Sequence, residues 1–253
     1  MDISEVHVSV TFTWDIEKAD ELYESWQILG VPVEVGGPAF DDRMGDFTPG
    51  LYVKQGMTFT SRGCNKSCWF CSVPRCSHGV IRELEILDGY NICDDNILGT
   101  SEAHFRKVIE MLRSQKERAV FSGGLEPALL QSWHAELLKS INPKTMYTAY
   151  DTKDDYEAIR IMAKTFWDAG FSPKGRQIKC YCLCGYDGDT FEAAESRMKQ
   201  IMGVGFLPFA MLFRDDNGET KPEWRRFQRE WANSFIVGYK FTEHTRNGGM
   251  LSV

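Results

Sequence analysis

Residues 57–71 have the sequence MTFTSRGCNKSCWFC, in which a strand-like run, Met57–Ser61, leads into Cys64, Cys68 and Cys71. The spacing of the cysteines is C-x3-C-x2-C. Three thiolates this close together can bind three irons of a cubane iron–sulfur cluster and leave the fourth iron open. A four-cysteine ferredoxin run closes every iron and makes an electron carrier. The spacing therefore predicts a reaction site rather than an electron carrier.

Outward from this run, strand and helix patterns alternate along the chain. Further strands are expected at 89–93, 119–121, 146–149, 177–183 and 207–213. Helices are expected at 101–115, 128–139, 154–169, 189–202 and 222–235. Before the run, we expect a strand at 6–12, a helix at 16–29, a strand at 31–35 and a polar loop at 41–49. Regular alternation of strands and helices favours an α/β fold with a parallel sheet.

Six strand–helix units follow residue 51, whereas a closed barrel of eight units typically takes ~250 residues. We therefore predict a partial (β/α)6 TIM-like barrel with a short N-terminal βαβ extension. The expected divisions are the extension at 1–50, the partial barrel at 51–220, and a helix and tail at 221–253 that close the barrel. The boundary at 50/51 follows the polar loop.

Unusual residues gather where the predicted strands end. These groups are the cysteine loop, Asp94-Asp95-Asn96, Ser122–Pro127, Tyr150-Asp151 and Cys184–Gly188. In parallel barrels the chemistry is located at the carboxyl ends of the strands. The common position of the groups predicts one active face.

The composition is that of an ordinary globular protein, with 253 residues, 43% apolar, 26% charged and a net charge of −7. No apolar run approaches the ~18 residues of a membrane span, and the N-terminus lacks a signal-peptide pattern. A cytoplasmic location is expected. In that compartment the eight cysteines indicate metal ligands, catalytic groups or buried apolar residues rather than disulfides. The net charge does not indicate nucleic-acid binding, although it leaves a local basic groove possible.

Phe70 stands at the aromatic position of C-x3-C-x-aromatic-C, and the run resembles the loop of the radical S-adenosylmethionine superfamily. The resemblance implies a [4Fe-4S] cluster on Cys64, Cys68 and Cys71, with S-adenosylmethionine chelated by the open iron and Phe70 near its adenine. Such enzymes cleave the cofactor reductively to a 5′-deoxyadenosyl radical that abstracts a hydrogen atom from substrate. An electron donor such as flavodoxin or ferredoxin is implied. The substrate class stays open between a peptide, a nucleotide and a small metabolite.

The run Gly123-Gly124-Leu125-Glu126-Pro127 resembles the family's Gly-Gly-x-Glu-Pro element, which binds the amino group of S-adenosylmethionine. Glycines let the backbone approach a ligand closely, and a carboxylate suits an ammonium. The resemblance therefore implies cofactor binding by Gly123, Gly124 and Glu126.

Further cofactor contacts are implied by the ends of the family's fourth and fifth strands, which approach the ribose and carboxylate of S-adenosylmethionine. The matching positions here are Tyr150, Asp151 and Gly185. Arg197, on the following helix, is expected to reach the carboxylate.

Two other groups are candidates for contact with the substrate. Asp94 and Asn96 lie at a strand end, where they predict either substrate binding or a solvated turn. Cys180, Cys182 and Cys184 alternate on a strand, with ~6–7 Å between them, which is too wide for one metal and favours a buried face. At the end of that strand, Cys184 is a possible hydrogen donor.

Two alternatives belong to other functional classes. Cys76 and His78 offer a further ligand for a structural zinc site with the three cysteines. An iron–sulfur sensor without catalysis is the other alternative. The first fifty residues resemble part of the domain that precedes the barrel in cobalamin-dependent members, but an Asp-x-His-x-x-Gly motif is missing. Cobalamin is therefore not expected.

Overall fold

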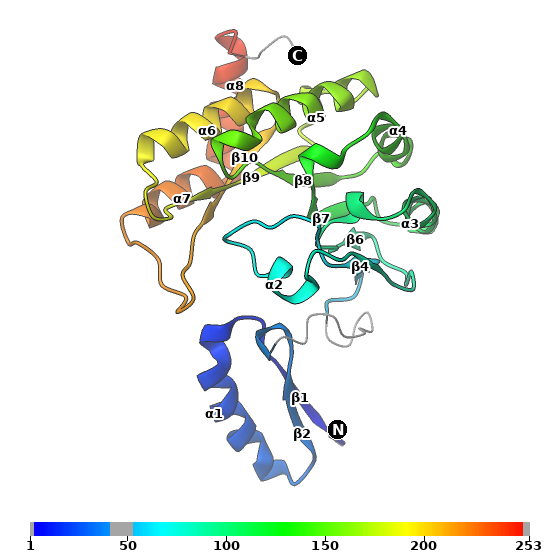
Figure 1. Cartoon of the computed structure of the whole chain (residues 1–253), viewed down its shortest axis with the longest axis vertical. Helices are drawn as coiled ribbons and strands as arrows, with labels where there is room; N and C mark the ends of the chain where they lie inside the picture. Colours follow the sequence, from blue (N-terminus) through cyan, green and yellow to red (C-terminus); the bar gives the residue numbers. More distant parts are fainter. Residues whose placement is uncertain (1–2, 41–52, 250–253) are drawn as a thin grey trace.

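A computed structural model describes residues 3–40 and 53–249, and Figure 1 shows its helices and strands. The N-terminal unit consists of β1 (Val6–Ser9), α1 (Ile16–Trp26) and β2 (Val33–Gly36). The two strands pair in parallel, with Val6 opposite Val33, so the unit has the expected βαβ order. The predicted loop at 41–49 and the boundary at 50/51 lie outside the described residues.

The main sheet has six strands in the spatial order β3, β6, β7, β8, β9 and β10. Their bounds are β3 Met57–Thr58, β6 Asn91–Ile92, β7 Val120–Leu125, β8 Thr145–Ala149, β9 Ile178–Cys184 and β10 Leu207–Leu212. Every neighbouring pair is parallel, which confirms the α/β class. The spatial order follows the chain order, so all carboxyl ends meet at one edge.

Four helices connect successive strands and form an arc along one side of the sheet (Figure 1). They are α3 (Glu102–Ser114), α4 (Ser132–Ile141), α5 (Tyr156–Asp168) and α6 (Phe191–Gly203). Each buries an apolar stripe; on α3 it comprises Phe105, Val108, Ile109 and Leu112. The side chain of Ser101 caps α3 by accepting a hydrogen bond from the backbone N–H of His104 at 3.2 Å. The predicted periodicities therefore produce the helical layer.

Side chains alternate between the two faces of the sheet, as the pleat requires. On β9, Cys180 and Cys182 are fully buried in the core shared with the helices. On the opposite face, Tyr181 stacks on Tyr147 of β8 with ring centroids 4.7 Å apart. Tyr181 also meets Phe209 of β10 edge-on at 5.7 Å. The face away from the helices is therefore aromatic.

The connection from β3 to β6 contains elements that the sequence patterns did not predict. They are β4 (Ser61–Arg62), α2 (Val73–Ser77) and β5 (Arg82–Glu83), and β4 pairs with β5 in antiparallel fashion. Two-residue strands are too short to produce a recognisable alternation. The cysteine loop lies between β4 and α2.

The predicted helix at 222–235 is observed as α7 (Trp224–Ala232), and a second helix that the sequence patterns did not predict, α8 (Ser234–Arg246), follows it. Asn233 separates them, because its side chain accepts hydrogen bonds from the N–H groups of Phe235 and Ile236 and so starts α8. Trp224 and Trp231 of α7 are buried in the core. Within residues 3–40 and 53–249, none of the helices combines the length and apolar character needed to cross a bilayer.

Candidate functional site

The cysteine loop is fixed to the carboxyl edge of the sheet by backbone hydrogen bonds. The N–H of Gly63 donates to the carboxylate of Asp95, just beyond β6, at 2.7 Å. Inside the loop, the N–H of Cys71 donates to the carbonyl of Cys68 at 3.1 Å. The N–H of Lys66 donates to the sulfur of Cys64 at 3.4 Å. The loop is therefore positioned by its own backbone and by Asp95, which the sequence placed at the active face as part of the group Asp94-Asp95-Asn96 but without a role of its own.

The Cys68 thiol is surrounded by acidic groups from three segments of the chain. Burial first, and then the neighbouring charges of Cys71, Glu126, Cys64 and Asp151, together raise the pKa of Cys68 to about 11. Glu126 follows β7 and Asp151 follows β8. The structure thus brings the three predicted cluster cysteines, Glu126 and Asp151 together at one edge of the sheet.

The loop has the donor chemistry for an iron–sulfur cluster, because thiolates are the ligands that hold such clusters. None of the eight cysteines, all of which are described, forms a disulfide. Across the described residues, no three His, Cys, Asp or Glu side chains are arranged as they stand to hold a metal ion.

Glu126 already holds a cation. Its carboxylate lies 3.3 Å from the ammonium of Lys66 in the cysteine loop, and it accepts the N–H of Ala128 at 3.4 Å. Burial alone would lower the pKa of Lys66, but the charge and hydrogen bond of Glu126 outweigh it and raise that pKa. The carboxylate thus pairs with an ammonium at the position where the resemblance implies a cofactor amine.

The two glycines of β7 differ in their surroundings. A side chain at Gly123 would collide with the backbone carbonyl of Asp94 on the neighbouring strand end, so close packing requires this glycine. Gly124 has a φ of +105°, and a Cβ there would meet no atom within 4 Å. A ligand therefore has space to approach the backbone at Gly124 but not at Gly123.

Asp94 has a different position from the one expected for a substrate contact. It is 1% exposed. Its carboxylate accepts the backbone N–H of Thr60 at 2.6 Å, the Thr60 hydroxyl at 2.6 Å and the Ser61 hydroxyl at 2.7 Å. The three bonds tie the end of β6 to Thr60, just before β4, and to Ser61, the first residue of β4. Asp94 therefore holds the base of the cysteine loop.

Asn96 contacts the cysteine loop directly. Its side-chain N–H group donates to the sulfur of Cys64 at 3.6 Å and to the side-chain oxygen of Asn65 at 3.3 Å. Asn96 is 2% exposed. Hydrogen bonds to cluster sulfurs are one of the means by which proteins set reduction potentials. The structure thus connects Asn96 to a candidate ligand rather than to a substrate space.

Tyr150 and Asp151 point to opposite sides of the strand end. The Tyr150 hydroxyl donates to Gln200 of α6 at 2.7 Å, so this side chain lies in the helical layer. Asp151 accepts the N–H of Leu183 at 2.8 Å, and burial raises its pKa to about 6. Only Asp151 lies near the cysteine loop.

Arg197 is also in the helical layer. Its guanidinium donates to the carboxylate of Asp189, with distances of 3.0 to 3.1 Å, and to the carbonyl of Leu183 at 2.9 Å. Asp189 also accepts the N–H of Gly185, which has a φ of +82°. Arg197 and Gly185 therefore shape the turn from β9 into α6, in place of the cofactor contacts implied for them.

Cys184 shares the helix-facing side of β9 with Cys180 and Cys182, and all three are 0% exposed. The side chain of Arg197 donates from Nε to the sulfur of Cys182 at 3.5 Å. The three cysteines therefore form the buried face expected from their alternation. The position of Cys184 directs its thiol away from the aromatic face of the sheet, so we do not assign hydrogen donation to it.

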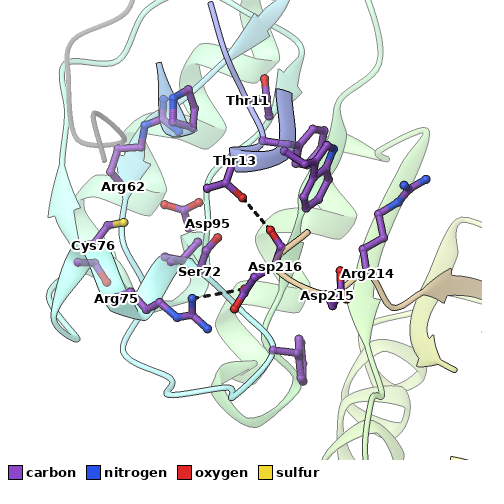
Figure 2. A pocket seen from close by; sticks show the side chains of 16 residues that line it. Thr11, Thr13, Arg62, Ser72, Arg75, Cys76, Asp95, Arg214, Asp215 and Asp216 are labelled. Carbon is purple, nitrogen blue, oxygen red and sulfur yellow. Dashed lines mark hydrogen bonds and ion pairs between the residues drawn. The ribbon is translucent and has the colours of Figure 1, made fainter. Parts of the chain in front are cut away.

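Aromatic residues brace the cysteine loop against the far strands. The ring of Trp69 lies 5.6 Å from Tyr186 and 5.6 Å from Phe213, which follow β9 and β10. Phe70 meets Trp69 edge-on at 5.4 Å. Phe70 also lines a cavity of about 390 Å³ that Figure 2 shows between the cysteine loop, the N-terminal unit and the segment after β10. Trp69 was not recognised from the sequence, because nothing in its spacing distinguishes it.

The fold and this edge define an α/β protein whose parallel sheet carries a cysteine-rich loop at its carboxyl ends. Comparison with profiles of known protein families gives no match, and comparison with curated protein sequences gives none either. The function must therefore be inferred from the groups that meet at this edge.

Proposed function

We propose that this chain is a radical S-adenosylmethionine enzyme in which Cys64, Cys68 and Cys71 bind a [4Fe-4S] cluster. The observation that carries the proposal is that Cys64, Cys71, Glu126 and Asp151 lie close enough to the Cys68 thiol for their charges to add to the effect of burial, which is the main reason that its pKa is raised. The Glu126 carboxylate, which can pair with an ammonium group, thus lies beside the three thiols. This combination suits a cluster with an open iron and a zwitterionic ligand.

The sheet supports a partial (β/α)6 barrel as the framework. Its six parallel strands follow chain order, and α3, α4, α5 and α6 cover one side only (Figure 1). A barrel wall has this arrangement, with helices outside and the active edge at the carboxyl ends. The aromatic face of Tyr147, Tyr181 and Phe209 would then be the inner wall.

When bound, the cluster and S-adenosylmethionine supply reductive cleavage to a 5′-deoxyadenosyl radical and hydrogen abstraction from a substrate. The residues of this chain position and shield that chemistry. Glu126 would hold the cofactor's ammonium in place of Lys66, and Gly124 would leave space for the methionine portion. Asn96 orients Cys64 through its N–H···S hydrogen bond. Reduction of the cluster would need an electron donor of the flavodoxin or ferredoxin type.

Anaerobic reconstitution with iron and sulfide tests the cluster. We expect about four irons per chain and a broad absorption near 400 nm that bleaches with dithionite. Alanine substitution of Cys64, Cys68 or Cys71 should abolish this uptake, whereas the matched variant Cys76→Ala should retain it. One tightly held zinc that is lost in Cys76→Ala would instead establish a structural zinc site and refute the proposal.

Cofactor cleavage is tested separately on the reconstituted protein. We expect 5′-deoxyadenosine to form on reduction with S-adenosylmethionine present. Glu126→Gln should keep its iron but bind S-adenosylmethionine more weakly, because an amide cannot neutralise an ammonium. A wild-type protein that takes up iron and forms no 5′-deoxyadenosine would be a cluster sensor rather than an enzyme.

A further inference from the structure

A groove between the end of β10 and α7 takes no part in the site described so far. Its volume of about 730 Å³ falls within the roughly 300–1,000 Å³ of small-molecule sites. One wall is the segment that follows β10, and the other is a face of α7, which packs against β10 (Figure 1). The polar side chains that line it are those of Arg214, Glu219, Thr220, Arg225, Gln228 and Arg229. The groove is therefore large enough for a metabolite and is rich in arginine.

The pattern of α7 explains why arginines line this groove. Trp224 and Trp231 are buried in the core, so they fix which face of the helix turns inward. Arg225 and Arg229 are four residues apart and lie on neighbouring turns of another face, where both are exposed. Arg226 lies in a second groove, which four glutamates also line. The aromatic stripe thus directs two arginines of α7 into the first groove and a third away from it.

The two arginines of α7 have hydrogen bonds but no carboxylate partner in the part of the chain that the structure describes. Nε of Arg225 donates to the hydroxyl of Thr220 at 3.4 Å, and Nε of Arg229 donates to the carbonyl of Arg225 at 3.3 Å. Their Nη groups are free of such bonds within the same described residues. Like charges four residues apart on a helix repel each other. An anion between the two guanidinium groups would relieve that repulsion.

Arg214 adds a third guanidinium group from the segment after β10. It donates from Nη1 to the carbonyl of Gly218 at 3.1 Å, and its guanidinium lies 5.9 Å from the ring centre of Trp14. Neither contact neutralises its charge. Arg214 lies on the boundary between this groove and the cavity beside the cysteine loop, since it lines both.

The acids near the groove do not cancel these charges. Of the described residues that line it, Glu219 is the one acid. Asp215 accepts the N–H groups of Asn217 and Glu219 at 3.0 and 2.8 Å, and Asp216 lies 3.8 Å from Arg75. Asp215 and Asp216 line the cavity beside the cysteine loop instead, where Figure 2 shows Asp216 directed toward Arg75. Three guanidinium groups and one carboxylate therefore leave the groove a surplus of two positive charges.

We infer that this groove binds the phosphate group of a small phosphorylated molecule, with Arg214, Arg225 and Arg229 as donors. A phosphate monoester carries about −1.5 to −2 charges at neutral pH, which matches the surplus, whereas a carboxylate carries one. The planar fork of a guanidinium group can donate two parallel hydrogen bonds to phosphate oxygens. The net charge of −7 disfavours a nucleic-acid polymer as the occupant.

The groove adjoins the cysteine loop through the end of β10. Leu212 lines the groove, and the next residue, Phe213, packs on Trp69 of the cysteine loop with ring centroids 5.6 Å apart. In parallel barrels, the loops after the last strands frequently form phosphate sites. We therefore assign the bound molecule as the substrate. This role, unlike the binding itself, rests on the proposed function.

Phosphorus NMR titration of the full-length chain in phosphate-free, low-salt buffer tests the site with inorganic phosphate and ribose 5-phosphate. We expect both probes to bind, whereas unphosphorylated ribose, followed by its proton signals, should not. Arg225→Gln and Arg229→Gln should each weaken the binding of inorganic phosphate by roughly threefold to tenfold, because solvent screens the charges of an open groove. The matched control is Arg226→Gln, which removes the same charge from the same helix but from the groove of the four glutamates. It should change the affinity little.

Thermal melting separates loss of binding from loss of folding. Without ligand, Arg225→Gln should melt at the wild-type temperature or above it, because the substitution removes the repulsion with Arg229. Added inorganic phosphate should raise the melting temperature of the wild type more than that of the variant. No binding of either probe at millimolar concentration, equal weakening by Arg226→Gln and Arg225→Gln, or tighter binding of a pentaribonucleotide would each overturn the inference.

The titration needs no cluster, so it can be carried out before and after anaerobic reconstitution. A chain that binds phosphate but takes up no iron would refute the proposed function alone. A chain that takes up iron but binds neither phosphate probe would refute the phosphate site alone.

Discussion

The buried pair formed by Arg197 and Asp189 gives the sharpest prediction about stability. Their side chains are 7% and 1% exposed. Arg197 also donates to the carbonyl of Leu183, and Asp189 accepts the N–H of Gly185. The pair thus joins the end of β9 to α6 and has almost no contact with water. Replacement of Arg197 by methionine keeps the length of the side chain and removes its charge.

The expected cost follows from the carboxylate that remains. In Arg197→Met, the buried Asp189 carboxylate keeps only the backbone N–H groups of Gly185 and Thr190 as donors. Breaking a buried pair in this way costs about 3–5 kcal/mol. For a chain of this size, that loss corresponds to a fall in melting temperature of about 6–20 °C. Arg197→Met combined with Asp189→Asn leaves no buried charge and keeps an acceptor for Gly185. The double variant should therefore recover at least half of the loss.

Thermal and urea unfolding of the two variants and the wild type measure these differences. The matched control is Arg160→Met, which removes an exposed pair with Glu157 on α5 and should change stability little. Binding of S-adenosylmethionine to folded Arg197→Met should match the wild type, because the guanidinium faces the helices. A melting temperature unchanged to within about 2 °C, or a loss of cofactor affinity without a loss of stability, would refute this reasoning.

Two further predictions concern the edge of the sheet. Gly124→Ala should lower the free energy of unfolding by about 1–3 kcal/mol through backbone strain. Gly123→Ala should lower it more, because its new methyl group meets the backbone of Asp94. Urea unfolding measures both losses, and a larger loss in Gly124→Ala would contradict the packing described at these glycines. Burial raises the pKa of Asp151 to about 6, so between about pH 4 and 6 the native state retains a proton that the unfolded state has lost, and stability falls as pH rises. Asp151→Asn should remove this decline and raise the free energy of unfolding by about 1–3 kcal/mol at pH 7. If the stabilities of the wild type and the variant change in parallel from pH 4 to 7, Asp151 is not the group responsible.

Long periodic segments were predictable because their patterns repeat. The strand expected at 177–183 is observed at Ile178–Cys184, and the helix expected at 189–202 at Phe191–Gly203. Boundaries set by single contacts were not predictable. The helix expected from 128 begins at Ser132, since Pro127–Leu129 first forms a 3-10 turn whose N–H at Ala128 is capped by Glu126. Likewise, α8 depends on the cap at Asn233.

In the candidate site, too, local sequence patterns were predictable and individual side-chain directions were not. Cys64, Cys68, Cys71 and Glu126 were found because their spacing is local and they follow strands. The direction of a side chain at a strand end depends on which face packs on the helices, and neighbouring positions point to opposite sides. Tyr150 and Cys184 therefore entered the candidate list although both face the helical layer.

The N-terminal unit has a thin interior, and this has a consequence for its dynamics. Among residues 3–40, only Val10 and Ala19 are buried, and a two-stranded sheet with so little core is marginally stable by itself. Its order depends on attachments such as the hydrogen bond from Thr13 to the carbonyl of Asp216 and the packing of Trp14 on Gly218. The unit should therefore open locally more often than the six-stranded sheet, and its amide hydrogens should exchange first. An occupant of the cavity would slow that exchange by joining two regions of unequal stability.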